Sequence, residues 1–284
     1  MQARLGENQY GKAEIRVMKV DRDRPRHVLH DLTVTVALAG DMDEVHLVGD
    51  NSAVLPTDTQ KNTVYAFARE HGVDQVEDFA ALLARHFVDT QQAVRRATVS
   101  VDEHQWERLA DHSFARAGGE TRATTVTHDA AGTRVRSGLR DLVLLSSTGS
   151  EFQGFATDRY TTLPETDDRI LCTSVDARWR HAEPQADWQA SYDAVRSALM
   201  TAFTDTYSRS LQQTLYAMGA RVVSSCQGIA EVRLRLPNRH HLLVDLEPFG
   251  LDNPGEVFHV DDRPYGLIEA TVLADDAAAD DGVW

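Results

Sequence analysis

The sequence is poor in lysine, cysteine and long apolar runs, and each shortage argues against a class of protein. Lysine occurs only at positions 12, 19 and 61, although lysine and arginine together number 29. Cys172 and Cys226 lie far apart and form no CxxC or Cys/His spacing, so neither a disulfide framework nor a zinc site is expected. No apolar run approaches the roughly 20 residues of a membrane-spanning helix, and residues 1–12 hold no apolar stretch typical of a secretory signal. These features predict a cytoplasmic protein with no membrane partner.

The charge balance argues against a nucleic-acid partner. The formal net charge is −15, and such a surface repels phosphate unless its basic residues cluster. A small anion is a different matter, because a single buried arginine dominates the field around it. With 284 residues and 42% hydrophobic content, the chain can bury the core of one large domain or of two ordinary ones.

The preference for arginine over lysine has two explanations. It is typical of a GC-rich genome or of a salt-adapted proteome. Alternatively, the remaining lysines, Lys12, Lys19 and Lys61, lie where an amine that can release a proton is needed, which a guanidinium group cannot do. Composition alone leaves both explanations open.

The first half of the chain has the pattern of two strands, two helices and further strands. Period-2 alternation over residues 13–20 and 27–38 predicts two half-buried strands. Thr57 followed by Gln60 has the spacing of a capping box and predicts a helix over residues 59–70. Apolar residues at helical spacing predict a second helix over residues 76–93. Residues 97–101 and 121–128 return to strand character, whereas 102–120 have weak periodicity and predict a variable connection.

The second half repeats this order. Strands are predicted at residues 139–147 and 169–179, helices at 188–207 and 210–223, and strands at 230–236, 241–246 and 265–273. Residues 274–284 are acidic and predict a frayed tail. We therefore expect an α+β protein with two tandem units, residues 1–139 and 140–284, each an antiparallel sheet with paired helices. Two helices do not cover both faces of a sheet, which favours packing against other subunits.

Familiar cofactor and catalytic motifs are missing. The sequence has no GxGxxG, GxxxxGK[ST], HExxH or GxSxG pattern. His27 and His30 are placed on opposite faces of the predicted strand, which makes them a poor metal pair. We therefore expect neither a metal nor an organic cofactor.

Three polar clusters interrupt the regular segments: residues 10–12, residues 57–58 and residues 236–240. The second opens a predicted helix, where unpaired N–H groups and the helix dipole can hold an anion. Each cluster also has an ordinary structural explanation. Thr57 is a plausible helix cap, Asn238 a plausible turn former and His240 a plausible surface histidine.

Longer stretches resemble a known family. Residues 142–169, LVLLSSTGSEFQGFATDRYTTLPETDDR, are similar to the signature of the uricase (urate oxidase) family, bacterial type. Further similar segments are YGKAEIRV from Tyr10, TDTQKNTVYAFA from Thr57, SLQQTLYAM from Ser210, LPNRHHLLVDLEPFGLDNP from Leu236 and DRPYGLIEAT from Asp262. They keep the family's order and span nearly the whole chain. The departures are small: serine at 146 for the usual lysine, proline at 56 for alanine, and leucine at 211 for a frequent valine.

The resemblance implies the tunnelling fold (T-fold): two tandem units of antiparallel sheet with paired helices, assembled as a homotetrameric barrel around a tunnel. It also implies active sites at subunit interfaces. There, Lys12, Thr57 and Asp58 of one chain would face the second unit of its neighbour.

The resemblance further implies the substrate-binding residues. Arg169 and Gln212 would clamp the purine, because a guanidinium fork and an amide match the edges of a planar anion. Phe152 would stack on the ring. The backbone N–H groups of Asp58 and Leu211 would complete the in-plane contacts.

The family's catalytic set maps onto Lys12, Thr57 and His240 as a proton relay. Thr57 and Asn238 would hold oxygen or water above the ring. A lysine amine suits such a relay, because removal from water favours its neutral form. The implied reaction is the cofactor-free oxidation of urate by O₂ and water to 5-hydroxyisourate and hydrogen peroxide, a step of purine degradation.

Two alternatives remain. One is another T-fold purine or pterin enzyme, although members that use zinc need Cys/His ligands. The other is a non-catalytic purine-binding protein that keeps Arg169 and Gln212. The presence of Lys12, Thr57, Asn238 and His240 favours turnover.

Overall fold

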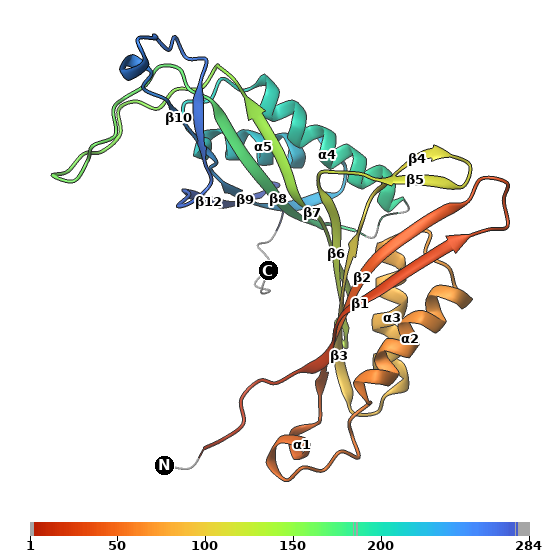
Figure 1. The fold of residues 1–284 in the computed structure, drawn as a ribbon. Helices are drawn as coiled ribbons and strands as arrows, with labels where there is room; N and C mark the ends of the chain where they lie inside the picture. Colours follow the sequence, from red (N-terminus) through yellow and green to blue (C-terminus); the bar gives the residue numbers. More distant parts are fainter. Residues whose placement is uncertain (1–2, 184, 186, 276, 278–284) are drawn as a thin grey trace. The chain divides into compact units, whose positions relative to one another are not determined.

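The chain forms two compact units, Met1–Gly138 and Leu139–Trp284, and each is described by itself. The computed structural model describes residues 3–183, 185, 187–275 and 277 (Figure 1). Most of the acidic tail predicted to fray, residues 276 and 278–284, therefore lies outside the described residues. No helix in the described ranges is both long enough and apolar enough to cross a membrane.

The first unit pairs an antiparallel sheet with two long helices. Its sheet runs in the order β1-β2-β3-β6, followed by the beginning of β7. The helices α2 and α3 lie along one face of this sheet (Figure 1). The elements are β1 (Tyr10–Asp21), β2 (Val28–Gly40), α1 (Asp43–Leu47), α2 (Thr57–Glu70), α3 (Val76–Thr90), β3 (Val94–Glu103), β4 (Trp106–Ala110), β5 (Ser113–Arg116), β6 (Thr121–Asp129) and β7 (Gly132–Ser146).

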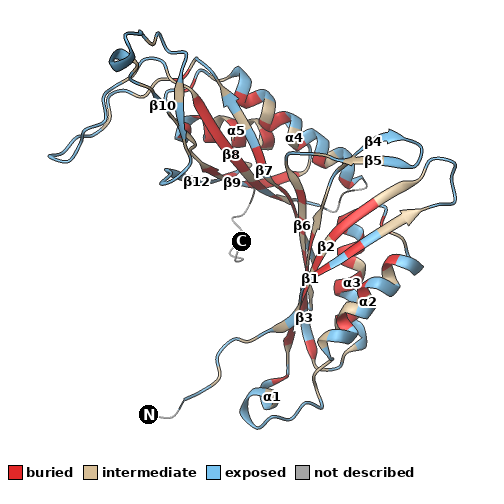
Figure 2. Cartoon of the chain, viewed as in Figure 1, coloured by how far each residue is buried: buried red, intermediate tan, exposed pale blue. Residues whose placement is uncertain are grey.

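The core of the first unit is formed by the apolar faces of its strands and helices. Alternate residues of β2, from Leu32 to Leu38, are buried because period 2 sends them all to the helix-covered face. Phe79, Leu83 and Phe87 recur at spacing four on α3 and pack in the same cluster. Figure 2 shows the burial concentrated where sheet and helices meet. The strands and helices predicted for this half are confirmed, within a few residues at their ends.

The predicted capping box at the start of α2 is wrong. The helix begins at Thr57 rather than at residue 59, and its N-cap is Pro56, with no side-chain cap hydrogen bond. The Pro56 carbonyl accepts the first helical bond, from the Gln60 N–H at 3.1 Å. Proline has no N–H for a capping glutamine to reach. The Gln60 side chain instead turns inward and is fully buried.

The expectation of a variable connection over residues 102–120 is also wrong. The segment contains the β4–β5 hairpin. The buried carboxylate of Asp31 on β2 accepts hydrogen bonds from Trp106 Nε1 at 3.0 Å and Arg116 Nη1 at 2.9 Å. These ties join residues about 75 or more positions apart in sequence, so local periodicity carries no sign of them.

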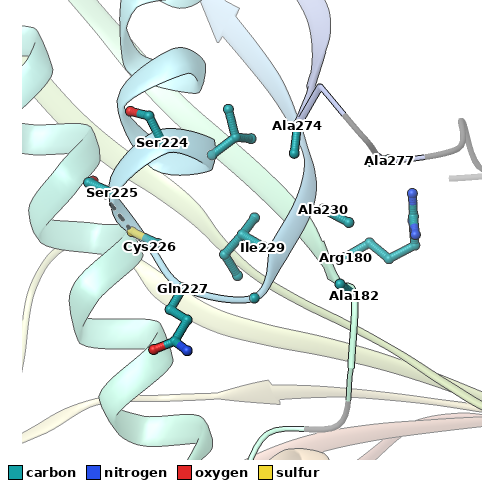
Figure 3. Close-up of a pocket in the computed structure, with 12 residues that line it drawn as sticks. Arg180, Ala182, Ser224, Ser225, Cys226, Gln227, Ile229, Ala230, Ala274 and Ala277 are labelled. Carbon is teal, nitrogen blue, oxygen red and sulfur yellow. Dashed lines mark hydrogen bonds between the residues drawn. The ribbon is translucent and has the colours of Figure 1, made fainter.

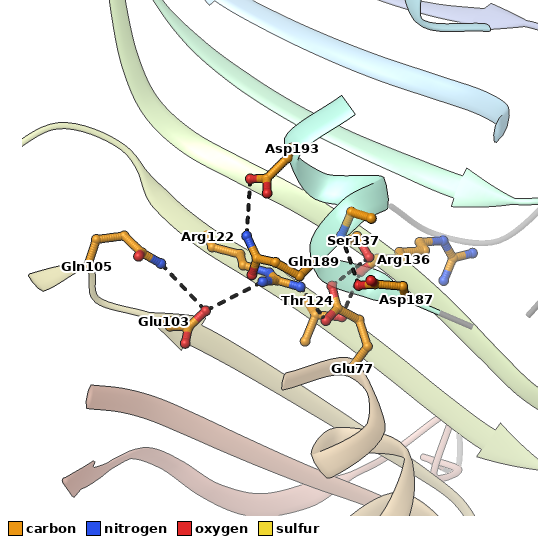
Figure 4. A network of polar contacts seen from close by, with 11 residues as sticks. Glu77, Glu103, Gln105, Arg122, Thr124, Arg136, Ser137, Asp187, Gln189 and Asp193 are labelled. Atoms are coloured by element: carbon orange, nitrogen blue, oxygen red, sulfur yellow. Dashed lines mark hydrogen bonds and ion pairs between the residues drawn. The ribbon is translucent and has the colours of Figure 1, made fainter. Parts of the chain in front are cut away.

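A buried ion pair lies at the first turn of α3. Glu77 is fully buried and accepts hydrogen bonds from Arg122 Nη2 and Ser137 Oγ, each at 2.8 Å. Arg122 also lies 3.8 Å from Glu103 (Figure 4). A buried carboxylate requires such partners because desolvation is costly. The network joins α3 to β3, β6 and β7.

The second unit repeats the arrangement. Its sheet runs β7-β8-β9-β12, and α4 and α5 pack on it through residues such as Trp179, Leu199 and Met218. A separate two-stranded sheet pairs β10 with β11. The elements are β8 (Leu171–His181), α4 (Trp188–Asp205), α5 (Leu211–Ser225), β9 (Ile229–Pro237), β10 (His240–Leu243), the 3₁₀ turn η1 (Glu247–Phe249), β11 (Phe258–Asp261) and β12 (Leu267–Leu273).

Candidate active site

The predicted site residues fall into two groups, one in each unit. Lys12, Thr57 and Asp58 belong to the first unit, at the beginnings of β1 and α2. The second unit holds the other predicted residues, which are Phe152, Arg169, Leu211, Gln212, Asn238 and His240.

The start of α2 presents uncommitted polar groups. Thr57 and Asp58 occupy the first two helical positions, where backbone N–H groups have no partner within the helix. The Thr57 hydroxyl makes no hydrogen bond with any residue in the described ranges. This end of the helix can therefore bind an anion through N–H groups and offer a hydroxyl beside it.

The Asp58 side chain, in contrast, is held by its own helix. Its carboxylate accepts from Lys61 Nζ at 2.5 Å and Asn62 Nδ2 at 3.0 Å. The hydrogen bond from Lys61 is the largest cause of the lowered pKa of Asp58, and the charge of Lys12 adds a smaller contribution. The carboxylate points to its own helix, so the backbone N–H of Asp58 is the group left for a ligand.

Lys12 lies between two irregularities of β1. Gly11 packs so closely on β2 that a Cβ there would lie 1.8 Å from the Val36 carbonyl oxygen. The pairing register then shifts between Lys12 and Ile15, where Glu14 has φ 55°. Lys12 itself is half-buried and forms no ion pair with the residues that the structure describes. These irregularities set off the Lys12 position from the regular ladder that follows.

Arg169 and Phe152 are neighbours in the second unit. The Arg169 guanidinium carbon lies 5.1 Å from the centre of the Phe152 ring. Arg169 Nε donates to Ser150 Oγ at 3.3 Å, while neither Nη atom has a hydrogen-bond partner within the described part of the chain. Burial lowers the pKa of Arg169, although the group stays charged. The free side of the fork suits a planar anion.

Phe155 packs against the Phe152 ring. The two rings are nearly parallel, at an interplanar angle of 15° and a centroid distance of 4.9 Å. This stack supports one face of Phe152. Phe155 is not among the residues predicted from the sequence, although it lies only three positions from Phe152.

A set of buried hydroxyl groups joins this segment to α5. Ser150 and Ser208 are buried and form a bridge between their backbones. Ser208 Oγ accepts from Thr214 Oγ1 at 2.8 Å, and the Arg169 N–H donates to the Ser150 carbonyl at 2.9 Å. These hydroxyl residues are not predicted from the sequence, since serine and threonine carry no periodic signal.

Helix α5 has the side-chain cap that α2 lacks, but here the second bond of a capping box goes to the residue before the N-cap. Ser210 is the N-cap and accepts from the Gln213 N–H at 3.2 Å. Gln213 Oε1 reaches back to the Arg209 N–H at 2.8 Å. The first helical N–H, of Leu211, is left free, while the Leu211 side chain is buried in the core. The neighbouring Gln212 is exposed, and its amide makes no hydrogen bond to a described residue.

Asn238 and His240 lie beyond the end of β9. The Asn238 backbone donates to the Gly266 carbonyl at 2.8 Å and bridges Thr173 of β8. His240 starts β10 opposite Asp261. Neither side chain forms a hydrogen bond with the residues described, so both offer their polar atoms.

Among the cavities of the described residues, two lie within single units. One, of about 590 Å³, lies between the end of α5 and β8–β9 beside Cys226 and Arg180, away from every predicted residue (Figure 3). The other, of about 560 Å³, is lined by Leu55 and Pro56, immediately before Thr57. In the described ranges, no three histidine, cysteine or acidic side chains gather as metal ligands.

Comparison with known proteins covers both units of the chain. The family model described as Uricase matches residues 8–127 and 135–269. The match includes most of residues 91–138, whose resemblance to the family is poor by sequence inspection alone. The uricase of Arthrobacter globiformis is 48% identical over 282 residues, covering 99% of this chain and 93% of that protein. The uricase of Dictyostelium discoideum is 36% identical, covering 95% and 97%.

The fold has the same relatives. The crystal structure of uricase from Arthrobacter globiformis matches with a TM-score of 0.96 and 47% identity, over 99% of this chain and 98% of that one. The predicted α+β class, with its antiparallel sheet and paired helices, is confirmed by this match.

Proposed function

The chain belongs to the uricase family, and we propose that it oxidises urate with O₂ and water, without a cofactor, to 5-hydroxyisourate and hydrogen peroxide. One observation carries the proposal. The polar atoms expected to touch the reactants, on Thr57, Arg169, Gln212, Asn238 and His240, have no hydrogen-bond partner in the described part of the chain. The polar groups around them are bonded to one another, which holds the uncommitted groups in place.

Urate binding rests on the second unit together with one N–H of the first. The two Nη atoms of Arg169 would donate in parallel to one edge of the anion. The Gln212 amide would give one donor and one acceptor to the opposite edge. Phe152, supported from behind by Phe155, would stack on the ring, a contact worth about 1 kcal/mol beyond burial. The N–H groups of Leu211 and Asp58 complete the plane.

We further propose that each site combines two chains of a homotetramer, with Lys12, Thr57 and Asp58 of one chain facing the second unit of its neighbour. Each unit by itself offers only part of the constellation. Exposed apolar side chains support association: Val143 and Leu145 on β7, and Leu242, Leu243 and Val260 on β10–β11, are about half exposed. Such surfaces are typical of subunit interfaces.

The chemistry would proceed by proton removal and electrostatics. Lys12 would take a proton through the Thr57 hydroxyl, and His240 would continue the relay. The resulting electron-rich urate dianion can transfer an electron to O₂ held near Thr57 and Asn238. The urate radical and the reduced oxygen then recombine to give a C5 hydroperoxide. Loss of hydrogen peroxide leaves an oxidised ring, and water adds to this ring to give 5-hydroxyisourate. Preorganised donors lower the barrier for the charged intermediates.

One assay tests the proposal against its alternatives. Purified protein is dialysed against chelator and mixed with urate, while urate absorbance, oxygen and peroxide are recorded together. We expect one O₂ consumed and one peroxide formed per urate. Activity lost on chelation and restored by a metal contradicts the cofactor-free mechanism. Urate binding without turnover would instead indicate a non-catalytic purine-binding protein, and inertness toward urate another T-fold enzyme.

A further inference from the structure

Tyr10 connects the two segments that carry Lys12 and Thr57. Its hydroxyl donates to the Leu55 carbonyl at 3.1 Å and accepts from the Leu55 N–H at 2.9 Å. Tyr10 is the first residue of β1, and Leu55 precedes α2 by two positions. One phenol therefore satisfies both backbone groups of a residue 45 positions away.

The hydrogen-bonded pair Tyr10–Leu55 lies at the same sequence distance from each of the two proposed relay residues. Tyr10 lies two residues before Lys12, and Leu55 lies two residues before Thr57. Strand pairing alone holds Lys12 weakly, because β1 is the outer strand of the first unit's sheet and its register shifts directly after Lys12. Pro56 stiffens the step from Leu55 to Thr57, since its φ is fixed. A shift of Tyr10 against Leu55 would therefore pass to Lys12 against Thr57.

Gln60 reinforces the same point from inside α2. Its Nε2 donates to the Leu55 carbonyl at 3.3 Å, so this oxygen accepts from both Tyr10 and Gln60. Gln60 is fully buried, and its Oε1 has no partner in the described ranges. A buried amide with an unsatisfied oxygen is unfavourable, so the hydrogen bond from Gln60 Nε2 to Leu55 offsets part of that cost. Burial raises the pKa of Tyr10, so the phenol remains a donor at neutral pH.

We propose that Tyr10, supported by Gln60, is a positioning residue that sets the distance between Lys12 and Thr57 for proton transfer. The inference rests on the proposed function, in which these two residues form the relay. Tyr10 touches neither urate nor oxygen in this scheme. It acts through Lys12 and Thr57, because proton transfer depends steeply on donor–acceptor distance.

The first test is Tyr10→Phe, which removes the hydroxyl and keeps the ring. We expect kcat per folded site to fall about 10- to 100-fold, as for a displacement of roughly 1 Å at a reacting pair. KM for urate is expected to hold, because Arg169 and Phe152 bind the ring elsewhere. Tyr65→Phe, an exposed tyrosine of α2, is the matched control and is expected to leave both constants unchanged.

A double-mutant cycle separates positioning from general stability. If Tyr10 acts through Lys12, then Tyr10→Phe added to Lys12→Met lowers kcat little further. If the kcat losses of the two single variants multiply in full in the double variant, the proposal is overturned. A Tyr10→Phe protein with the kcat of the parent would overturn it as well. If Tyr10→Phe does not fold, Gln60→Met removes the amide in a residue of similar size. It is expected to lower kcat in the same direction by a smaller factor, and an unchanged kcat overturns the proposal.

A measurement made without substrate distinguishes the positioning role of Tyr10 from the proposed oxidation of urate. The chain has lysine only at 12, 19 and 61, so lysine labelled with ¹³C at Cε gives few NMR signals, and Lys12→Arg assigns the one of interest. In Tyr10→Phe we expect the Lys12 signal to shift or broaden while those of Lys19 and Lys61 hold. An unmoved Lys12 signal overturns the positioning role. A parent protein inert toward urate overturns the proposed function alone.

Discussion

At the scale of single residues, the uncommitted side chains differ in the step they serve. Arg169 would hold urate in both ground and transition states, whereas Lys12 would act only when a proton moves. The structure gives them different surroundings: Arg169 is anchored to Ser150 beside Phe152, and Lys12 lies near the start of α2, where its charge acts on Asp58.

Substitutions of Arg169 and Lys12 are therefore expected to change different constants, the first urate binding and the second kcat. Arg169→Ala should weaken urate binding by about 2–5 kcal/mol, because the anion is left without its charged partner. Lys12→Met should leave binding nearly intact and lower kcat by roughly 10²- to 10⁴-fold. Steady-state kinetics and equilibrium titration measure both. A steep rise in Kd for Lys12→Met with kcat maintained would make Lys12 a binding residue and His240 the next candidate for the base.

His181, at the end of β8, links burial to the pH dependence of stability. Burial lowers its pKa from 6.5 to about 4, so between these values the unfolded chain binds a proton that the folded chain does not. The contribution of neutral His181 to the free energy of unfolding is complete above pH 6.5 and is lost as the pH falls toward 4. From pH 7 to 5 the loss is about 2 kcal/mol.

We expect the His181→Gln protein to lose less stability than the parent between pH 7 and pH 5, by about the amount that His181 contributes. Urea unfolding at both pH values measures it, with the partly exposed His71 replaced by glutamine as the control. Equal pH dependence in parent and His181→Gln would show that other groups dominate.

At the scale of elements, helix starts and helix packing decide where the site can form. Both α2 and α5 begin with free N–H groups, but only α5 has a side-chain cap. Helix α5 also approaches β12 closely at Gly219, where an added Cβ would lie 2.5 Å from Val272 Cγ2. That contact sets how near the helix lies to the sheet.

Gly219→Ala tests this packing. Alanine gains up to about 1 kcal/mol in helix propensity, but overpacking against a buried β-branched residue costs about 1–3 kcal/mol. We expect a net loss of stability in denaturant unfolding. Val272→Ala in the Gly219→Ala background should recover part of it. A Gly219→Ala protein more stable than the parent would mean that α5 moves away from β12 without penalty.

At the scale of the whole molecule, the proposed site needs two chains. Each unit has its own core, and its share of the constellation lies at the ends of its elements. Association would bury apolar side chains of β7, β10 and β11 that are exposed on the single chain.

Complementation between inactive variants tests the shared site. Lys12→Met and Arg169→Ala chains, mixed in equal amounts and allowed to exchange subunits, should regain up to about a quarter of the parental activity, because about a quarter of all the interfaces then hold both native residues. The activity is measured alongside mass spectrometry of the exchanged oligomers. Exchange without recovered activity would contradict a site shared between subunits.

The sequence by itself determined the α+β class, most helices and strands, the family and the identity of the candidate site residues. These depend on periodicity and on residue types at local spacing. Only the tertiary structure decided that Pro56 rather than Thr57 caps α2, that Asp31 anchors a hairpin within residues 102–120, and that Tyr10 binds Leu55. The contacts of Asp31 and Tyr10 join residues 45 to 85 positions apart. They depend on which buried polar groups face each other after packing, and local propensity carries no information about that.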